Sequence, residues 1–211
     1  MEHLKIIFDK YAEIYRRILK DFYPAKGSTG FPERNLSVNW SKAVESVYDG
    51  DNVTSWFEFQ FGEDNNKHID ALIWDKASKD LYFVESKRYS NPKSKIREVG
   101  EDIVRLFNLY KELRTEENER INIGLVEHCY GVILADVWTK KEGRTGRKIK
   151  ILNSYKNGSF LEDFKEIISE NESLEKNNIH GFPNLKYYYE EFDWVSKNEN
   201  YALVSFAWTI S

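Results

Sequence analysis

Apolar residues recur at helical spacing in three long stretches of the chain. Residues 4–22, 39–48 and 91–113 each carry an apolar stripe with charged or polar residues between its members, and this spacing predicts three amphipathic helices. Pro92 stands at the start of the third stretch, where proline is tolerated because the first turn of a helix leaves its amide groups unbonded. Residues 159–169 predict one further, shorter helix.

The spacing changes after residue 54, where apolar and polar residues alternate or form short apolar runs. Residues 55–61, 67–74 and 81–88 are bounded by polar turns, which predicts three strands in succession. Strands joined by such short turns pair as an antiparallel meander. Additional strands are predicted over residues 131–138, 148–152 and 201–210. The first of these follows the long helix, so a crossover can bring it parallel to a meander strand.

The order of these elements predicts an α/β fold with a three-layer core. Its central mixed sheet would hold the meander and the strand after the crossover helix, flanked by helices, with extra C-terminal strands and a helix. A chain of 211 residues is expected to form a single domain. Within it we assign 1–38 to an N-terminal helix and loop, 39–138 to the core, and 139–211 to a C-terminal extension packed on the core.

Composition narrows the classes of function. The formal net charge is −4, whereas a protein that coats nucleic acid non-specifically is strongly basic. No apolar run approaches the ~18 residues of a membrane-spanning helix, and no apolar signal segment follows Met1. The single cysteine, Cys129, cannot form an internal disulfide. We therefore expect a cytoplasmic protein that does not contact a membrane.

Two acidic residues on neighbouring predicted strands carry the chemical interest. Folding the hairpin of residues 67–88 symmetrically about its turn places Trp74 opposite Leu81. The same register places Asp70 opposite Glu85, with Cβ atoms about 4.5–5.5 Å apart. Two such charges repel by about 3 kcal/mol at an effective dielectric constant near 20, whereas a divalent cation between them is bound. Oxygen ligands favour Mg²⁺, with Mn²⁺ as a close substitute.

Lys87 follows Glu85 by two residues and therefore lies on the same face of its strand. From there it could contact a scissile phosphate or orient a water molecule on the metal. The alternative is a surface strand on which Glu85 and Lys87 are solvated and Asp70 pairs with a lysine. A register shift of one residue would place the two acids on opposite faces of the sheet, leaving an unrelated α/β domain with an accidental motif.

This arrangement resembles the PD-(D/E)xK nuclease superfamily, whose restriction-endonuclease-like fold runs helix, three-stranded meander, helix, strand. The family signature is an acid on the second strand and an acid-x-lysine triplet on the third, and Asp70 and Glu85-Ser86-Lys87 match it within residues 39–138. The resemblance implies a Mg²⁺-dependent endodeoxyribonuclease that hydrolyses phosphodiester bonds of DNA. It also implies that Asp70, Glu85 and a backbone carbonyl near Ser86 hold the metal and that Lys87 is catalytic.

The resemblance implies further site residues. Members often carry an acid on the helix before the meander; Glu45 is the candidate here, as a second metal ligand and catalytic residue, although a solvated helix face explains it equally well. Glu58 and Gln60 share a face of the first strand, and we favour a solvent-facing pair on an edge strand over metal ligands. Ile69 replaces the proline of the family motif, and residues 91–113 contain no glutamine, which argues against the exonuclease-like branch.

Basic residues after the triplet are candidate DNA contacts, because lysine and arginine bind phosphates; they are Arg88, Lys93, Lys95 and Arg97. A second basic group within residues 140–150 is interpreted as ordinary surface. The acidic net charge supports a rival function, namely a non-catalytic nuclease-like module that binds or interacts within a larger DNA-processing or defence assembly. The sequence leaves open whether the chain forms a homodimer or joins a larger protein assembly.

Overall fold

The computed structural model contains three α-helices and one six-stranded sheet within the residues that it describes. Those residues are 2–22, 31–62, 67–88, 92–115, 121–140, 156–159, 162, 184–195 and 199–210, with the backbone alone for 92–97, 123, 139 and 140. Among them, no helix has both the length and the apolar character that crossing a bilayer requires.

The sheet is mixed, with the strand order β1-β2-β3-β4-β6-β5. Its strands are β1 (Val53–Phe61), β2 (Lys67–Asp75), β3 (Asp80–Arg88), β4 (His128–Lys140), β5 (Lys186–Phe192) and β6 (Glu199–Thr209). β3 and β4 pair in parallel, and all other neighbours pair antiparallel. The predicted meander is therefore confirmed, as is the parallel strand that follows the long helix.

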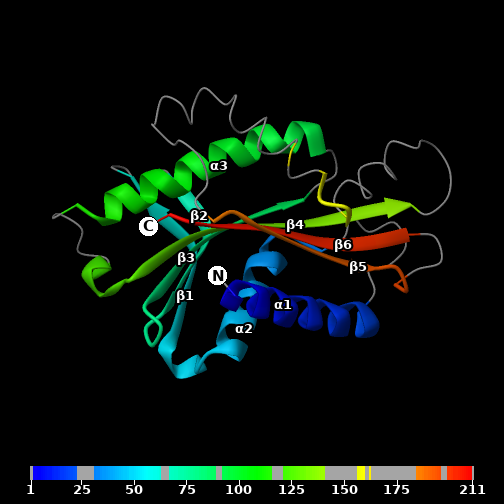
Figure 1. The fold of residues 1–211 in the computed structure, drawn as a ribbon, viewed down its shortest axis with the longest axis horizontal. Coiled ribbons are helices and arrows are strands. Elements are labelled where there is room, and N and C mark those ends of the chain that lie inside the picture. Colours follow the sequence, from blue (N-terminus) through cyan, green and yellow to red (C-terminus); the bar gives the residue numbers. More distant parts are fainter. Residues whose placement is uncertain are drawn as a thin grey trace.

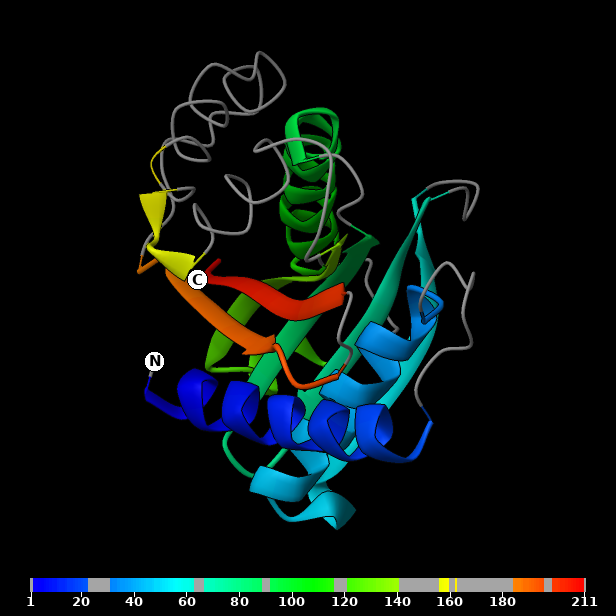
Figure 2. The ribbon, with the colours of Figure 1, turned by 90° about the vertical axis from the view of Figure 1, so that its right-hand side faces the viewer.

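The helices cover both faces of the sheet, which gives three layers (Figures 1 and 2). Helices α1 (Glu2–Asp21) and α2 (Arg34–Val47) pack on one face, and α3 (Pro92–Leu113) packs on the other. We call these the α1/α2 face and the α3 face. The predicted helix at 39–48 begins earlier than expected, at Arg34.

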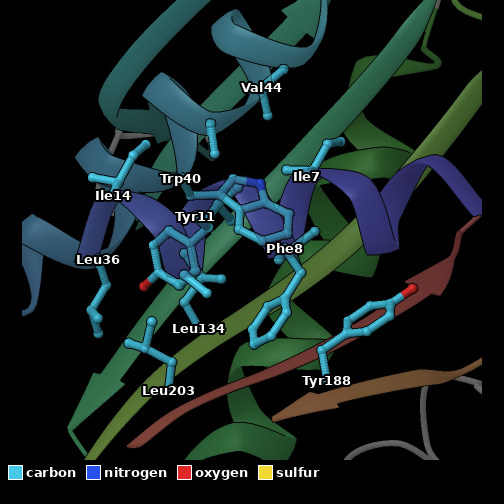
Figure 3. Close-up of a cluster of buried hydrophobic side chains, with 14 of the residues drawn as sticks. Ile7, Phe8, Tyr11, Ile14, Leu36, Trp40, Val44, Leu134, Tyr188 and Leu203 are labelled. Atoms are coloured by element: carbon cyan, nitrogen blue, oxygen red, sulfur yellow. The ribbon is translucent and has the colours of Figure 1, made fainter. Parts of the chain in front are cut away.

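Each face of the sheet has its own apolar core because strand residues point alternately to the two sides. On the α1/α2 face, Trp40 of α2 meets Tyr11 of α1 edge-on, with ring centroids 5.4 Å apart. Phe8 stacks on Tyr188 of β5 at 5.4 Å (Figure 3). On the α3 face, buried leucine, isoleucine and valine side chains of the helix pack on the other side of the strands. The sheet is thus buried on both sides.

The described C-terminal strands belong to the central sheet and do not form a separate layer on the core. β6 lies between β4 and β5, and residues 201–208 are buried throughout. Gly131 of β4 pairs with Trp208 of β6, and a Cβ atom on Gly131 would overlap the Trp208 indole. The predicted strand at 148–152 lies outside the described residues, as does most of the predicted helix at 159–169.

The β1–β2 pair has an irregularity that sets the position of Asp70. The register pairs Phe57 with Ala71 and Phe59 with Ile69, while Glu58 between them has a φ of +54°, which is uncommon for a residue other than glycine. Phe57 and Ala71 pack in the α1/α2-face core, whereas Phe59 and Ile69 pack in the α3-face core. The side chains of both strands therefore change face at this point.

Candidate active site

The hairpin register predicted for β2 and β3 is confirmed where the two strands pair. The ladder runs from Asp75 opposite Asp80 to Ala71 opposite Val84, and it includes Trp74 opposite Leu81. Continuing this register by one pair would place Asp70 opposite Glu85. At this point the Asp70 side chain turns toward β3, and Ser86 N–H donates a hydrogen bond to Asp70 Oδ2 at 2.6 Å.

That hydrogen bond gives the Ser86 amide a side-chain acceptor where the paired ladder ends, so the amide is not left unsatisfied. It also fixes the Asp70 carboxylate beside β3. Burial raises the pKa of Asp70 above its usual value, and the hydrogen bond from Ser86 and the charge of Lys87 oppose that rise. The Ser86 amide therefore contacts the Asp70 carboxylate directly. The resemblance implies both residues as metal ligands.

Glu85 is almost fully enclosed beneath α3, with a side-chain exposure of 2%. Arg105 of α3 donates from Nη1 to Glu85 Oε1 at 2.9 Å. Burial raises the pKa of Glu85 to about 9, with contributions from the nearby charges of Asp102 and Asp70, although Arg105 and Lys87 oppose the rise. Glu85 is a carboxyl group that holds its proton at neutral pH unless more positive charge is brought to it.

Lys87 also faces α3, and its Nζ lies 3.0 Å from Asp102 Oδ2. Burial acts to lower the pKa of Lys87, but the charge and hydrogen bond of Asp102, together with Glu85, outweigh burial and hold that pKa above its usual value. The Lys87 side chain is 17% exposed. The alternative of a surface strand with solvated Glu85 and Lys87 is therefore wrong.

Two residues of α3 complete the cluster, and the sequence analysis identified neither. Asp102 is buried, and burial raises its pKa, against the opposing charges of Lys87 and Arg105. Arg105 donates from Nη2 to Asp102 Oδ1 at 2.8 Å and from Nη1 to the His68 carbonyl at 3.3 Å. The available signal was Asp102 itself, an acid directly before Ile103 in the apolar stripe and three residues before Arg105.

The cluster has an excess of negative charge when all of its members are ionised. It contains three carboxylates, Asp70, Glu85 and Asp102, and two cations, Lys87 and Arg105. Its net charge is therefore −1 in a largely buried setting, where unbalanced charge is unfavourable. Burial is the main cause of the raised pKa values of the three acids, and the excess of negative charge makes the cluster receptive to a cation.

Glu45 is not part of this cluster. Its Oε1 accepts a hydrogen bond from Ser41 Oγ at 3.0 Å, and Ser41 Oγ lies 2.6 Å from Ser55 Oγ near the start of β1. Helix α2 buries Trp40 and Val44 against the α1/α2 face, whereas the cluster lies on the α3 face. The catalytic and metal-binding role that the resemblance implied for Glu45 therefore has no support in the structure.

Arg88 is also directed away from the cluster. It follows Lys87 on a strand, so its side chain points to the opposite face; its Nε lies 3.9 Å from Asp136 Oδ1. Its backbone N–H donates to Glu33 Oε1 at 2.9 Å. Burial raises the pKa of Asp136 to about 7, and Arg88 opposes that rise. Arg88 thus lies beside buried Asp136 on the face opposite the cluster, and its assignment as a DNA contact stays a prediction.

The remaining candidate DNA contacts lie in the first turns of α3, namely Lys93, Lys95 and Arg97; their backbone is described but their side chains are not. Glu58, Gln60 and His68 are exposed on the edge strand β1 and on β2. His68 Nε2 lies 3.9 Å from Glu58 Oε2. The exposure of Glu58 and Gln60 agrees with the solvent-facing pair that we favoured for them.

Within the part of the chain that the structure describes, no set of three or more histidine, cysteine, aspartate or glutamate side chains forms a ready-made metal site. The donors that the cluster offers are carboxylate oxygens, which are hard ligands of the kind that Mg²⁺ prefers. The contact with Ser86 uses one carboxylate oxygen of Asp70. The contact with Arg105 uses one carboxylate oxygen of Glu85. No family model, curated protein or solved structure matches this chain at a significant level.

Proposed function

We propose that this protein is a Mg²⁺-dependent nuclease of the PD-(D/E)xK type, with a restriction-endonuclease-like fold, that hydrolyses phosphodiester bonds of DNA. The observation that carries the proposal is the place where β2 and β3 stop pairing. There Asp70 reaches β3 through the Ser86 amide, while Glu85 and Lys87 point from β3 into the same charged cluster under α3. The order of helix, meander, helix and parallel strand supports the same family.

Asp70, Glu85 and a backbone carbonyl near Ser86 would hold the metal ion. The fit rests on the chemistry of these donors, which are carboxylate oxygens. Burial raises the pKa of both acids, and a bound cation would oppose that rise. When bound, Mg²⁺ would supply Lewis-acid activation of water and of the phosphate. Ionised Asp70 and Glu85 would hold that charge in a fixed place next to Lys87.

Lys87 would act as a fixed positive charge. Its pKa lies above the usual value for lysine because Asp102, Glu85 and Asp70 together outweigh the effect of burial. An ammonium group with a raised pKa keeps its proton at neutral pH, so it cannot serve as a general base. It can stabilise the negative charge that develops on a phosphate during hydrolysis. Asp102 would be a positioning residue that holds Lys87 in place.

A cleavage assay tests the proposal directly. Wild type, Asp70→Ala and Lys87→Ala would be incubated with single-stranded, double-stranded and branched DNA and with RNA, with Mg²⁺, with Mn²⁺ or with a chelator. We expect metal-dependent cleavage of DNA by the wild type and loss of it in both variants, while circular dichroism shows an intact fold. Glu45→Ala is the matched control and should cleave normally. Cleavage by Lys87→Ala at the wild-type rate would refute the role given to Lys87.

A second candidate function is a non-catalytic nuclease-like module within a larger DNA-processing or defence assembly. The observation that favours it is that Glu85 and Lys87 already have polar partners in Arg105 and Asp102, so the cluster can be stable without a metal. Calorimetric titration with Mg²⁺ or Mn²⁺ separates the two functions. The module predicts no metal-dependent heat in wild type or Asp70→Ala, whereas the nuclease predicts binding by the wild type that Asp70→Ala weakens.

A further inference from the structure

Trp56 is an exposed aromatic residue close to the candidate active site. It lies on the edge strand β1, where it pairs with Leu72 of β2. Trp56 is 60% exposed. Asp70 lies two residues from Leu72 along β2, just past the point where the side chains of β1 and β2 change face. Trp56 and Asp70 are therefore carried by neighbouring stretches of one strand pair.

The indole is on the same side of the sheet as the charged cluster. Its partner Leu72 belongs to the α3-face core, and its ring contacts Phe59, which belongs to the same core. The two rings meet edge to face, with centroids 5.3 Å apart and planes at 87°. Because Phe59 is itself 1% exposed, this contact holds the indole against a rigid part of the fold. A fixed ring loses little conformational freedom when a ligand binds.

The surroundings of Trp56 are polar. The other large hydrophobic residues that are exposed in the described part of the chain lie on or next to other elements: Ile6, Phe22, Leu125 and Trp194. None of these is on β1 or β2, where the other exposed residues are all polar: Thr54, Glu58, Gln60, Lys67 and His68. A protein-docking surface needs a contiguous apolar patch, and a single indole among polar groups does not form one. This setting suits a flat aromatic ligand with polar edges.

We infer that Trp56 stacks on an unpaired nucleobase of the nucleic acid whose phosphate reaches Asp70, Glu85 and Lys87. The inference rests on the proposed function and names its substrate class. A base inside a duplex is covered on both faces by its neighbours, so only a single-stranded or frayed nucleotide can offer a free face to the indole. Glu58 beside Trp56 repels phosphates but not neutral bases. The substrate is therefore single-stranded, or has a frayed end.

Binding measured without cleavage tests this inference. The probes are a fluorescein-labelled oligothymidylate, its abasic analogue of equal length, a blunt duplex and an oligouridylate, with Ca²⁺ replacing Mg²⁺ and fluorescence anisotropy as the readout. Trp56→Ala should bind the single strand roughly tenfold more weakly, and Trp56→Phe should retain most of the affinity. Trp194→Ala is the matched control, because Trp194 is also exposed, at 50%, and should change nothing. Trp56→Ala and the wild type should bind the abasic strand with the same affinity.

The uridylate arm decides whether the base is recognised in RNA as well as in DNA. Unchanged affinity of Trp56→Ala for the single strand would overturn the inference. So would an equal loss for the abasic strand, or the conversion of a wild-type dimer to monomers by Trp56→Ala in sedimentation. If the wild type cleaves DNA but Trp56→Ala binds as tightly as the wild type, the stacking inference is wrong and the nuclease proposal stands. If binding depends on Trp56 but no metal supports cleavage, the nuclease proposal is wrong and the stacking inference stands. No binding by the wild type would overturn both.

Discussion

Lys87 Nζ on β3 lies 3.0 Å from Asp102 Oδ2 on α3, so a residue of the helix layer sets the position and charge of a lysine in the sheet. Asp102 in turn accepts a hydrogen bond from Arg105, which also reaches Glu85. Asp102 and Arg105, which lie about one helical turn apart on α3, thus contact both charged residues of the acid-x-lysine triplet. The roles of the triplet can be tested through this pair without altering the triplet itself.

Asp102→Asn should change the pH dependence of cleavage. Removing this carboxylate takes away the strongest influence that raises the pKa of Lys87, while the effect of burial, which lowers it, remains. The alkaline limb of the pH–rate profile should therefore move to lower pH, and the maximal rate should fall roughly tenfold or more because Lys87 is less well positioned. Glu101→Gln, an exposed acid next to Asp102 on α3, is the control. An unchanged alkaline limb in Asp102→Asn would contradict the positioning role.

Arg105→Met should destabilise the fold. It leaves Glu85 and Asp102, each with a side-chain exposure of 2%, without their shared hydrogen-bond donor. We expect the free energy of unfolding in urea to fall by about 1–3 kcal/mol, the usual effect of leaving a buried polar group unsatisfied. Arg114→Met removes an exposed arginine that follows directly on the last residue of α3 and bonds Tyr110, and it should change stability by less than about 0.5 kcal/mol. Equal effects of the two substitutions would count against the buried network.

Metal binding should release protons. Because the pKa of Glu85 is raised to about 9, this carboxyl carries a proton at neutral pH that a bound Mg²⁺ must displace. Affinity for Mg²⁺ should therefore rise as the pH rises toward about 9, by up to roughly tenfold per pH unit. Titration calorimetry at pH 7 in two buffers of different ionisation enthalpy should detect about one released proton. Glu85→Gln should bind more weakly and release fewer protons, whereas a pH-independent affinity would rule out Glu85 as a ligand.

Gly131→Ala should disturb the centre of the sheet. A Cβ atom at this position would overlap the indole of Trp208, which is completely buried on β6. Overpacking of this kind costs about 1–3 kcal/mol, and thermal unfolding should show a lower melting temperature. The double variant Gly131→Ala/Trp208→Leu should be less unstable than the sum of the two single variants, because the smaller side chain makes room. Additive effects would show that the two residues do not share this space.

The local parts of the fold followed from the sequence. The β2–β3 register could be predicted because a short symmetric hairpin fixes which residues face each other, as the Trp74–Leu81 pair shows. Helical spacing likewise located all three α-helices of the described residues. These features depend on residues near one another in the chain, where period and turn position carry most of the information.

The contacts between layers could not be obtained in this way. Period identifies the apolar face of a helix but not the strand over which each residue lies. The period therefore gives no sign that α3 carries Asp102 and Arg105 across β3 to Lys87 and Glu85. The distance of Glu45 from the cluster was hidden for the same reason, since α2 packs on the opposite face of the sheet. The irregularity at Glu58, where the side chains of β1 change face, was also unpredictable, because regular alternation through β1 gives no sign of it.

The place of β6 between β4 and β5 has a consequence for biosynthesis. During translation, β4 has β3 as its neighbour on one side, but its other side stays unpaired until residues 199–209 leave the ribosome. An apolar strand with an open edge recruits strands from other chains, so nascent chains of this protein should depend on chaperones and aggregate when synthesis stops before β6.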